Sequence, residues 1–341
     1  MATKPMSYRR LGRSGLTVSR IVLGTMMFGG RTDEAESRKI IASAAERGVN
    51  FIDTADTYAG GASEGITGRA IAADRHGWVL ATKLANPNGA GPNRRGLSRK
   101  WIMDEAHVSL RRLGTDFIDI LYMHKEDPLT PAEEMVRAMA DLQRSGAIRY
   151  FGVSNFMSWR IAKICAVCDA EGIDRPVVSQ PQYNLLNRTV ENEQLPVCGA
   201  FGIGLVPYSP TAKGVLTGKY AQGTAPPPDS RAVAQEKRMA ETDFQPAALA
   251  VADKIVAHAR ARGVDPAAFA TAWVLANPLV TGAIAGPRTM AQWETYLAAL
   301  DVTIGPEEEA FVDSLVPAGT TAVPQFIDPV YPVQGRARVV G

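Results

Sequence analysis

Short apolar runs alternate with amphipathic segments along most of this chain, and that alternation restricts the possible folds more than any other feature. Eight of the runs are predicted to be buried strands: Ile21–Leu23, Asn50–Asp53, Trp78–Thr82, Phe117–Tyr122, Ile148–Val153, Val177–Gln180, Gly204–Pro207 and Val280–Ala285. The segments with helical periodicity are Glu34–Arg47, Ser63–Ala72, Lys100–Arg112, Ala132–Arg144, Trp159–Glu171, Ala267–Ala276 and Met290–Leu300. Strands that alternate with helices favour a parallel sheet covered by helices.

The sequence after the first strand favours a closed barrel over an open sheet. It reads LGTMMFGG, which is not the G-x-G-x-x-G turn and helix of an open dinucleotide-binding sheet. We therefore predict an α/β fold of the (β/α)8 TIM barrel type. Tyr8–Leu11 and Thr17–Ser19 flank the turn Gly12–Gly15 and predict an N-terminal β-hairpin. Lys83–Leu97 and Lys213–Asp243 are predicted as long loops on the C-terminal face, where barrel enzymes place their active sites.

Size and charge limit the possible partners. The 341 residues are predicted to form a single barrel domain over 1–341, with 317–341 as an extended C-terminal tail. The 37 basic and 35 acidic residues nearly balance, which argues against nucleic acid or an anionic membrane as the main partner. No signal peptide or membrane span is recognisable, and the three cysteines fit a reducing compartment, so we expect a cytoplasmic protein. The motif Cys165-x-x-Cys168 is predicted to pack inside a helix, and no metal site is predicted.

Four polar residues stand at or just beyond the C-terminal ends of three successive predicted strands: Asp53 and Tyr58, then Lys83, then His124. In a parallel barrel these strand ends converge on one face. A neighbouring ammonium lowers the pKa of a tyrosine from about 10 toward the range useful for proton donation. Asp53 can pair with a buried Lys83, and His124 can orient a carbonyl or join the proton path. Taken singly, the four residues are also compatible with a loop cap, a loop aromatic, a surface charge and a structural histidine.

The sequence around these positions resembles the aldo-keto reductases. FIDTADTY, VLATK and ILYMH are similar to three signature blocks of that family, in the same order and with similar spacing. The resemblance continues through LGTM, YFGVSN, SQPQYNLLNR, LVPYSPTAKGVLTGKY and AIAGPR, from about Tyr8 to Leu315. It is nearer to the branch that contains general bacterial aldo-keto reductases and the β subunits of voltage-gated potassium channels. It implies the barrel fold and an NADPH-dependent, reversible reduction of an aldehyde or ketone.

The resemblance also implies a role for each of the four residues. Tyr58 would protonate the carbonyl oxygen while hydride passes from C4 of the nicotinamide to the carbonyl carbon. Lys83 and Asp53 would tune Tyr58, and His124 would position the carbonyl. Together, Tyr58 and His124 would stabilise the negative charge that develops on that oxygen.

The resemblance implies a set of cofactor contacts as well. Ser154, Asn155 and Gln180 would bind the carboxamide. Tyr208 would stack on the nicotinamide ring. The full implied set is Gly24, Thr25, Met26, Asp53, Ser154, Asn155, Gln180, Tyr208, Ser209, Pro210, Thr211, Ala212, Lys219, Arg231, Gly286, Arg288 and Gln292.

NADPH is expected rather than NADH because arginine supplies fixed charge and paired donors for a 2′-phosphate. Arg288 precedes a predicted helix whose N-terminal donors also suit phosphate, and Arg231 matches a second arginine of the related branch. Thr295 and Tyr296 stand where relatives carry Glu-Asn for adenine, so NADH remains an alternative cofactor. Thr211 stands where many relatives have leucine.

Two other functions remain open. One is a cofactor-sensing regulatory subunit with weak reductase activity, as the channel branch suggests, and the other is an aldolase or isomerase that uses Lys83 as a Schiff base. The substrate is expected to be a small molecule: a bulky ketone such as a keto-mycotoxin, an aromatic aldehyde or a sugar. The candidate residues for the substrate pocket wall are Met26, Phe28, Trp101, Phe326 and Tyr331.

Overall fold

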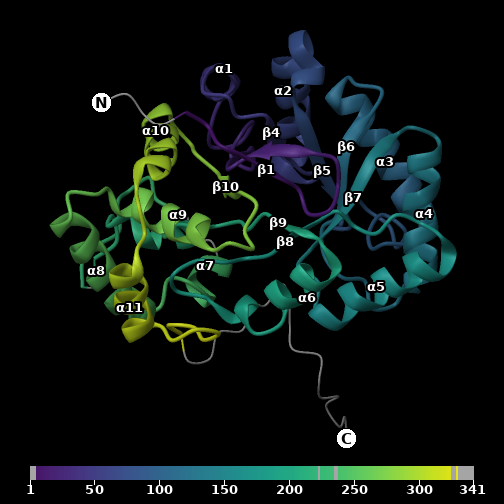
Figure 1. Ribbon diagram of the computed structural model, residues 1–341. Helices are drawn as coiled ribbons and strands as arrows, with labels where there is room; N and C mark the ends of the chain where they lie inside the picture. The colour runs from purple at the N-terminus through teal and green to yellow at the C-terminus, as the bar shows by residue number, and fades with distance from the viewer. Residues whose placement is uncertain (1–4, 222, 234–236, 324–327, 329–341) are drawn as a thin grey trace, which may run out of the picture.

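Eight parallel strands form the sheet at the centre of the molecule (Figure 1). The structure is a computed structural model that describes residues 5–221, 223–233, 237–323 and 328. The sheet order is β10-β3-β4-β5-β6-β7-β8-β9. Leu205 in β9 also pairs in parallel with Val280, just before β10, which brings the two edges together. The predicted (β/α)8 barrel is therefore confirmed. The strands are β3 (Ile21–Gly24), β4 (Phe51–Asp53), β5 (Val79–Leu84), β6 (Ile118–Met123), β7 (Ile148–Ser154), β8 (Val178–Gln180), β9 (Gly204–Leu205) and β10 (Ala283–Ala285).

Helices form the outer layer around the sheet (Figure 1). They are α1 (Glu34–Glu46), α2 (Ala62–Ile71), α3 (Arg99–Leu113), α4 (Ala132–Arg144), α5 (Ser158–Glu171), α6 (Gln194–Phe201), α7 (Lys237–Glu241), α8 (Pro246–Ala261), α9 (Pro266–Ala276), α10 (Met290–Ala298) and α11 (Pro306–Leu315). Local sequence sets their ends. Helix α3 begins where the Ser98 side chain accepts a hydrogen bond from the Trp101 amide, and it ends at Gly114, whose φ is 63°.

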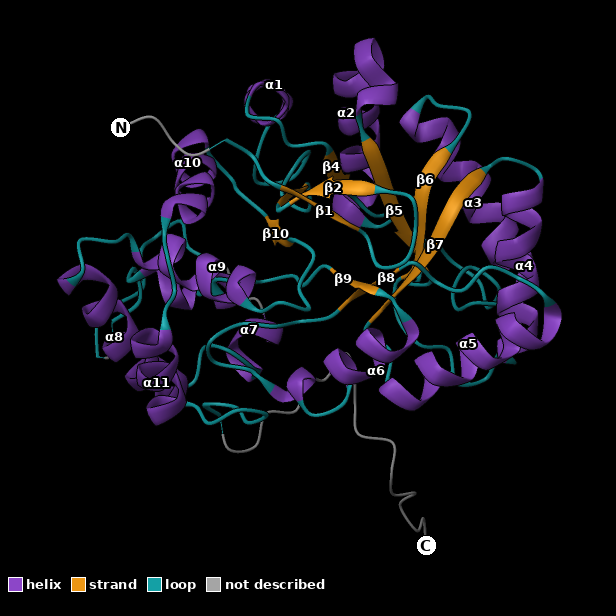
Figure 2. Cartoon of the chain, viewed as in Figure 1, coloured by secondary structure: helices purple, strands orange, loops and turns teal. Residues whose placement is uncertain are grey.

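The predicted N-terminal hairpin is present as β1 (Tyr8–Arg10) paired antiparallel with β2 (Thr17–Ser19), and it lies in front of the sheet in Figure 2. Leu11, at the start of its turn, is fully buried and packs with residues from inside the barrel, including Phe51 and Ile120. The hairpin thus covers one end of the barrel interior.

Several element boundaries differ from the sequence prediction. Strand β5 continues to Leu84, so Lys83 lies inside the strand rather than beyond it. Helices α6, α8 and α11 are additional to the predicted set, and the predicted loop Lys213–Asp243 contains α7. The single domain and its extended tail stay predictions, because most of the tail after Val323 lies outside the described residues.

Two further features concern helices. None of the helices within the described residues is long and apolar enough to span a bilayer. Cys165 and Cys168 are free and fully buried in α5, as expected for packing residues. Burial raises the pKa of Cys165 to about 11 and that of Cys168 to about 12, so neither thiol ionises near neutrality.

Candidate active site

The C-terminal ends of β4, β5 and β6 bring together residues that are far apart in the sequence. Asp53 is the last residue of β4, Lys83 is the penultimate residue of β5, and His124 directly follows β6. Tyr58 begins a short 3₁₀ turn after β4. The parallel register aligns these ends, because Asp53 pairs with Ala81 and Lys83 pairs with Tyr122. The four residues predicted as a group therefore do meet on one face of the barrel.

Lys83 connects two of these side chains. Its Nζ donates to Asp53 Oδ2 at 2.5 Å, to the Thr54 carbonyl at 2.7 Å and to Tyr58 Oη at 3.3 Å. Lys83 is fully buried. Its pKa is nevertheless raised, because attraction to Asp53 and Tyr58 together outweighs the lowering effect of burial. The ammonium is therefore retained beside the Tyr58 hydroxyl.

The pKa of Tyr58 differs from the sequence expectation. Burial raises it above the ordinary value, and the lowering effect of Lys83 offsets this only in part. The prediction that the ammonium brings the pKa of Tyr58 below 10 is therefore wrong for the protein alone. The physical reason is that burial penalises the phenolate more than one neighbouring cation stabilises it. Tyr58 consequently keeps its proton near neutral pH.

His124 is a neutral imidazole. Its pKa lies well below the usual range, first because of burial and then because Lys83, Arg238 and Lys125 repel a further positive charge. The rings of Tyr58 and His124 lie edge to face, with their centroids 6.1 Å apart. Asn86, which was not predicted as a site residue, places its Nδ2 3.0 Å from His124 Nδ1. Its only sequence signal is its position three residues after Lys83.

The residues predicted to bind a carboxamide are connected to the same group. Gln180 Nε2 donates to Asp53 Oδ1 at 2.9 Å, and Ser154 Oγ donates to the Gln180 carbonyl at 2.8 Å. Asn155 Nδ2 donates to the His124 carbonyl at 3.0 Å. Tyr208 Oη donates to Asn155 Oδ1 at 2.8 Å. Hydrogen bonds thus link the ends of β4, β6, β7 and β8 below a single cavity.

This cavity has a volume of about 480 Å³, within the usual range for small-molecule sites. It is lined by every predicted cofactor residue except Ala212, which is fully buried. Of the candidate wall residues for the substrate, Met26 lines it. Phe28 and Trp101 are buried and do not line it, so those two assignments are wrong. Phe326 and Tyr331 lie outside the described residues.

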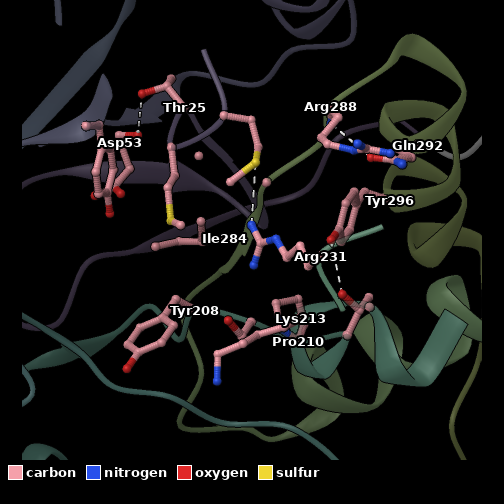
Figure 3. A pocket seen from close by; sticks show the side chains of 18 of the residues that line it. Thr25, Asp53, Tyr208, Pro210, Lys213, Arg231, Ile284, Arg288, Gln292 and Tyr296 are labelled. Atoms are coloured by element: carbon pink, nitrogen blue, oxygen red, sulfur yellow. Dashed lines mark hydrogen bonds between the residues drawn. The ribbon is translucent and has the colours of Figure 1, made fainter. Parts of the chain in front are cut away.

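The cavity has two chemically different ends (Figure 3). Asp53, Tyr58, His124 and Gln180 define what we call the inner end. Arg31, Lys219, Arg231 and Arg288 define the outer end. In Figure 3, Asp53 and Tyr208 lie on the left and Arg288 and Gln292 on the right, with Arg231 between them.

The outer end is a cluster of cations with one exposed carboxylate. Arg288 Nη2 donates to Asp229 Oδ2 at 2.9 Å, and Arg31 donates to the Asp229 carbonyl. The pKa of Lys219 is lowered, first by burial and then by repulsion from Arg288 and Arg231. Concentrated positive charge of this kind suits an anionic ligand. The inner end instead offers amide and tyrosine groups, so the cavity combines a site for anionic groups with neutral hydrogen-bonding groups.

Other contacts lie near Arg288 at the outer end of the cavity. The Arg288 amide donates to Gln292 Oε1 at 2.8 Å, and the Thr289 side chain caps the start of α10. Tyr296, one of the two departures from relatives, shares a hydrogen bond of 3.2 Å with Thr211 Oγ1. Thr295 also lines the cavity. The two residues that replace Glu-Asn therefore face the same space as Arg288.

Comparisons with known proteins agree with this geometry. Residues 20–317 match the model of the Aldo/keto reductase family. The chain is 38% identical over 304 residues to a probable voltage-gated potassium channel subunit beta of Oryza sativa, covering 87% of this chain and 92% of the relative. It is 35% identical over 331 residues to the oxidoreductase YrpG of Bacillus subtilis, covering 94% and 99%. It is 32% identical over 337 residues to versiconal hemiacetal acetate reductase of Aspergillus parasiticus, covering 90% and 96%.

Proposed function

The chain belongs to the aldo/keto reductase family, and on that premise we propose that it reduces an aldehyde or ketone to the alcohol with NADPH. The family and its oxidoreductase relatives make the chain an oxidoreductase that acts on small carbonyl compounds. The observation that carries the finer proposal is the chain of side chains from Asp53 through Lys83 to Tyr58, which ends at the cavity.

Tyr58 is the proposed proton donor. Because Lys83 donates to Tyr58 Oη, the hydroxyl proton is free to be donated away from Lys83, toward the cavity. The raised pKa keeps that proton on Tyr58 near neutral pH. Lys83 then stabilises the phenolate left after proton transfer, and Asp53 holds Lys83 in place. When bound, the nicotinamide supplies the hydride.

His124 is proposed to hold the carbonyl oxygen together with Tyr58. A neutral imidazole donates one hydrogen bond without releasing its proton, so Tyr58 stays the acid. Two donors directed at one oxygen stabilise the charge that develops there. Lys83 does not line the cavity and is bonded to Asp53, which argues against a Schiff base.

The preference for NADPH is supported by the outer end of the cavity. Arg288 directs both terminal nitrogens of its guanidinium to Asp229, an arrangement that also suits a phosphate. Arg231 and Lys219 add positive charge nearby. The 2′-phosphate of NADPH would be attracted to these positive charges, whereas NADH lacks that phosphate.

The proposed substrate is a bulky ketone or an aromatic aldehyde rather than a sugar. Met26, Met27, Ile284 and Tyr208 give the cavity apolar and aromatic wall surface. Such a wall favours an apolar body beside the carbonyl. One relative is named as a reductase of versiconal hemiacetal acetate, which gives a precedent for a large substrate in a related chain.

A regulatory role is a second candidate, favoured by the relatives named as potassium channel β subunits. It is the weaker candidate, because the proposed proton donor and its lysine and aspartate partners are all present. A regulatory subunit would bind the cofactor tightly and reduce carbonyl compounds weakly or not at all.

A substrate panel tests the proposal. NADPH and NADH oxidation would be followed with aromatic aldehydes, bulky ketones and sugars, with the alcohol product identified. We expect turnover of the first two groups and a higher kcat/KM with NADPH than with NADH. Tight NADPH binding with no turnover of any carbonyl would refute the reductase proposal and favour the regulatory one.

A further inference from the structure

We propose that Asn86 is a positioning residue that fixes His124 in the tautomer with its proton on Nε2, ready to donate to the substrate oxygen. The inference rests on the proposed carbonyl reduction, in which His124 holds that oxygen. It concerns a residue outside the four predicted from strand ends. Asn86, His124 and Tyr58 all line the same cavity.

The contact between the two side chains defines the tautomer. Asn86 Nδ2 lies 3.0 Å from His124 Nδ1. With the Asn86 nitrogen facing the ring, we infer that Nδ1 offers its lone pair, because an amide nitrogen donates and does not accept. A neutral imidazole carries one proton, which must then lie on Nε2. Nε2 is the ring nitrogen that Asn86 leaves available for a ligand.

The positive charges around the His124 ring keep it neutral, so the position of its single proton determines which ring nitrogen can donate. The charged side chains that act on His124 are Lys83 from β5, Lys125 from its own loop and Arg238 from α7, and all three are cations. Tyr58, from the turn after β4, faces the ring and is uncharged near neutrality. The ring is therefore neutral, with two tautomers of which only one has a donor at Nε2. The neighbour at Nδ1 decides between them.

The backbone holds both residues in place. The His124 amide donates to the Leu84 carbonyl at 2.8 Å, and the Gly96 amide donates to the Ala85 carbonyl at 2.9 Å. Ala85 has a φ of 128°, a conformation that residues other than glycine rarely adopt. Such strain persists only where the surrounding structure enforces it, and it often occurs at functional sites. Here it turns the chain after β5, immediately before Asn86.

The consequence is a pair of neutral donors. With Nε2 protonated, His124 and Tyr58 each offer one hydrogen to the substrate oxygen. With Nδ1 protonated instead, His124 would present a lone pair there and repel the oxygen. If the tautomer is fixed before the substrate binds, the imidazole proton does not have to move from Nδ1 to Nε2 during the reaction.

Nitrogen NMR of the histidine side chains tests this directly. The chain has four histidines, and His124→Gln identifies the His124 signals in the full-length protein. We expect Nε2 protonated and Nδ1 unprotonated, with no change between pH 6 and 8. Protonation of Nδ1 in the unsubstituted protein would overturn the proposal, whatever the variants do. This measurement needs no activity, so it stays decisive if the protein reduces none of the carbonyls tried.

Two alanine variants of the same loop separate positioning from loop stability. Asn86→Ala removes the amide from His124, whereas Asn88→Ala removes an amide that bonds Glu105 instead. We expect Asn86→Ala alone to mix the two tautomers and to lower kcat by about ten-fold, less than the loss of a whole oxyanion donor. NADPH affinity should not change. Asn86→Gln, which keeps the amide, should recover part of kcat.

The outcomes distinguish the two proposals. If Asn86→Ala and Asn88→Ala have the same tautomer populations as each other and the same kcat, the proposed role of Asn86 is overturned. The proposal of carbonyl reduction is then unaffected. The expected tautomer in a protein that reduces no carbonyl would refute the proposed function and leave the role of Asn86 in fixing the ring.

Discussion

The two ends of the cavity hold charge in opposite ways. At the inner end, Asp53 pairs with Lys83 behind the cavity wall, and both side chains are almost completely inaccessible to solvent. At the outer end, Arg288 pairs with Asp229, whose side chain is 77% exposed. The inner charges already have their partners in the protein. Arg288 has a carboxylate partner that an anionic ligand can replace.

In the proposed function, this difference would separate the reaction at the inner end from cofactor binding at the outer end. A buried pair is costly to break, so its geometry is set before any ligand arrives. An exposed pair contributes little and is screened by salt, so a phosphate can displace the carboxylate at small cost. We therefore expect substitutions at the inner end to affect turnover and folding, and substitutions at the outer end to affect cofactor affinity.

The largest effect is expected from Tyr58→Phe, which removes the proposed proton donor and keeps the ring. Carbonyl reduction should fall by about 10²–10⁴-fold, the usual contribution of general acid catalysis. NADPH affinity should stay unchanged, as measured by equilibrium titration. Tyr296→Phe is the matched control, because it removes a tyrosine hydroxyl that lines the same cavity and bonds Thr211 instead of Lys83. Equal losses of turnover in Tyr58→Phe and Tyr296→Phe would contradict the proposal that the reaction takes place at the inner end only.

The next effect concerns stability. Lys83→Met leaves the Asp53 carboxylate buried without its cation, which should destabilise the protein by about 3–5 kcal/mol in urea unfolding. The double variant Lys83→Met with Asp53→Leu should regain much of that loss, because no unpaired charge remains. Arg288→Met, at the outer end, should have a free energy of unfolding close to that of the unsubstituted protein. A loss of stability in Arg288→Met as large as that in Lys83→Met would contradict the difference between the two ends of the cavity.

A buried carboxyl two residues before Tyr58 gives a pH dependence. Asp56 is fully buried, and among the described residues no side chain donates a hydrogen bond to its carboxylate; the nearby Thr57 amide and Arg112 lower its pKa only in part. Burial, followed by repulsion from Glu105 and Glu64, raises its pKa to about 8. An unfolded aspartate titrates at about 3.9, so from about pH 4 to pH 8 the native state holds a proton that the unfolded state has lost. The stability contribution of Asp56 therefore falls as pH rises through this window.

Asp56→Asn should remove this slope, because asparagine does not titrate. Relative to the unsubstituted protein, the variant should gain about 2 kcal/mol between pH 6 and pH 8, measured by urea unfolding at both values. Asp104→Asn on α3 is the control, since that carboxylate is exposed and paired with Lys100. An Asp56→Asn protein with the unchanged slope would show that Asp56 ionises normally.

Cofactor selectivity tests the outer end. Arg288→Ala should weaken NADPH binding by about ten-fold or more, because the guanidinium that bonds Asp229 here would no longer be present to bond the proposed 2′-phosphate. NADH affinity should change little, and kcat at saturating NADPH should persist. A matching loss of NADH affinity would mean that Arg288 contacts something other than the 2′-phosphate.

The smallest effect is expected from Asp229→Asn, which removes the carboxylate that now occupies Arg288. NADPH should bind more tightly, by less than about five-fold, since exposed pairs contribute little. The gain should shrink at high salt. Weaker binding would show that Asp229 helps to hold Arg288 in place instead of competing with the ligand.

Much of the fold was predictable because it follows from local patterns. The strands are short apolar runs, and their period and spacing mark them within one or two residues for most of the barrel. The exceptions are informative. Strand β5 extends through Lys83, because Asp53 satisfies a lysine that pattern alone would leave at the surface. Helix α6 contains Pro196 and two glycines within or just after it, which obscured its helical pattern.

The sequence by itself determined the barrel and the meeting of Asp53, Tyr58, Lys83 and His124, because parallel strand ends share one face. Only the tertiary structure decided how those groups behave. Asn86 meets His124 across 38 residues, Asp229 meets Arg288 across 59, and Gln180 meets Asp53 across 127. The direction in which the pKa of Tyr58 shifts also depends on burial, and burial is the combined effect of many contacts around the side chain. No local pattern encodes such sums, because desolvation and contacts between loops exist only after the chain has closed around the site.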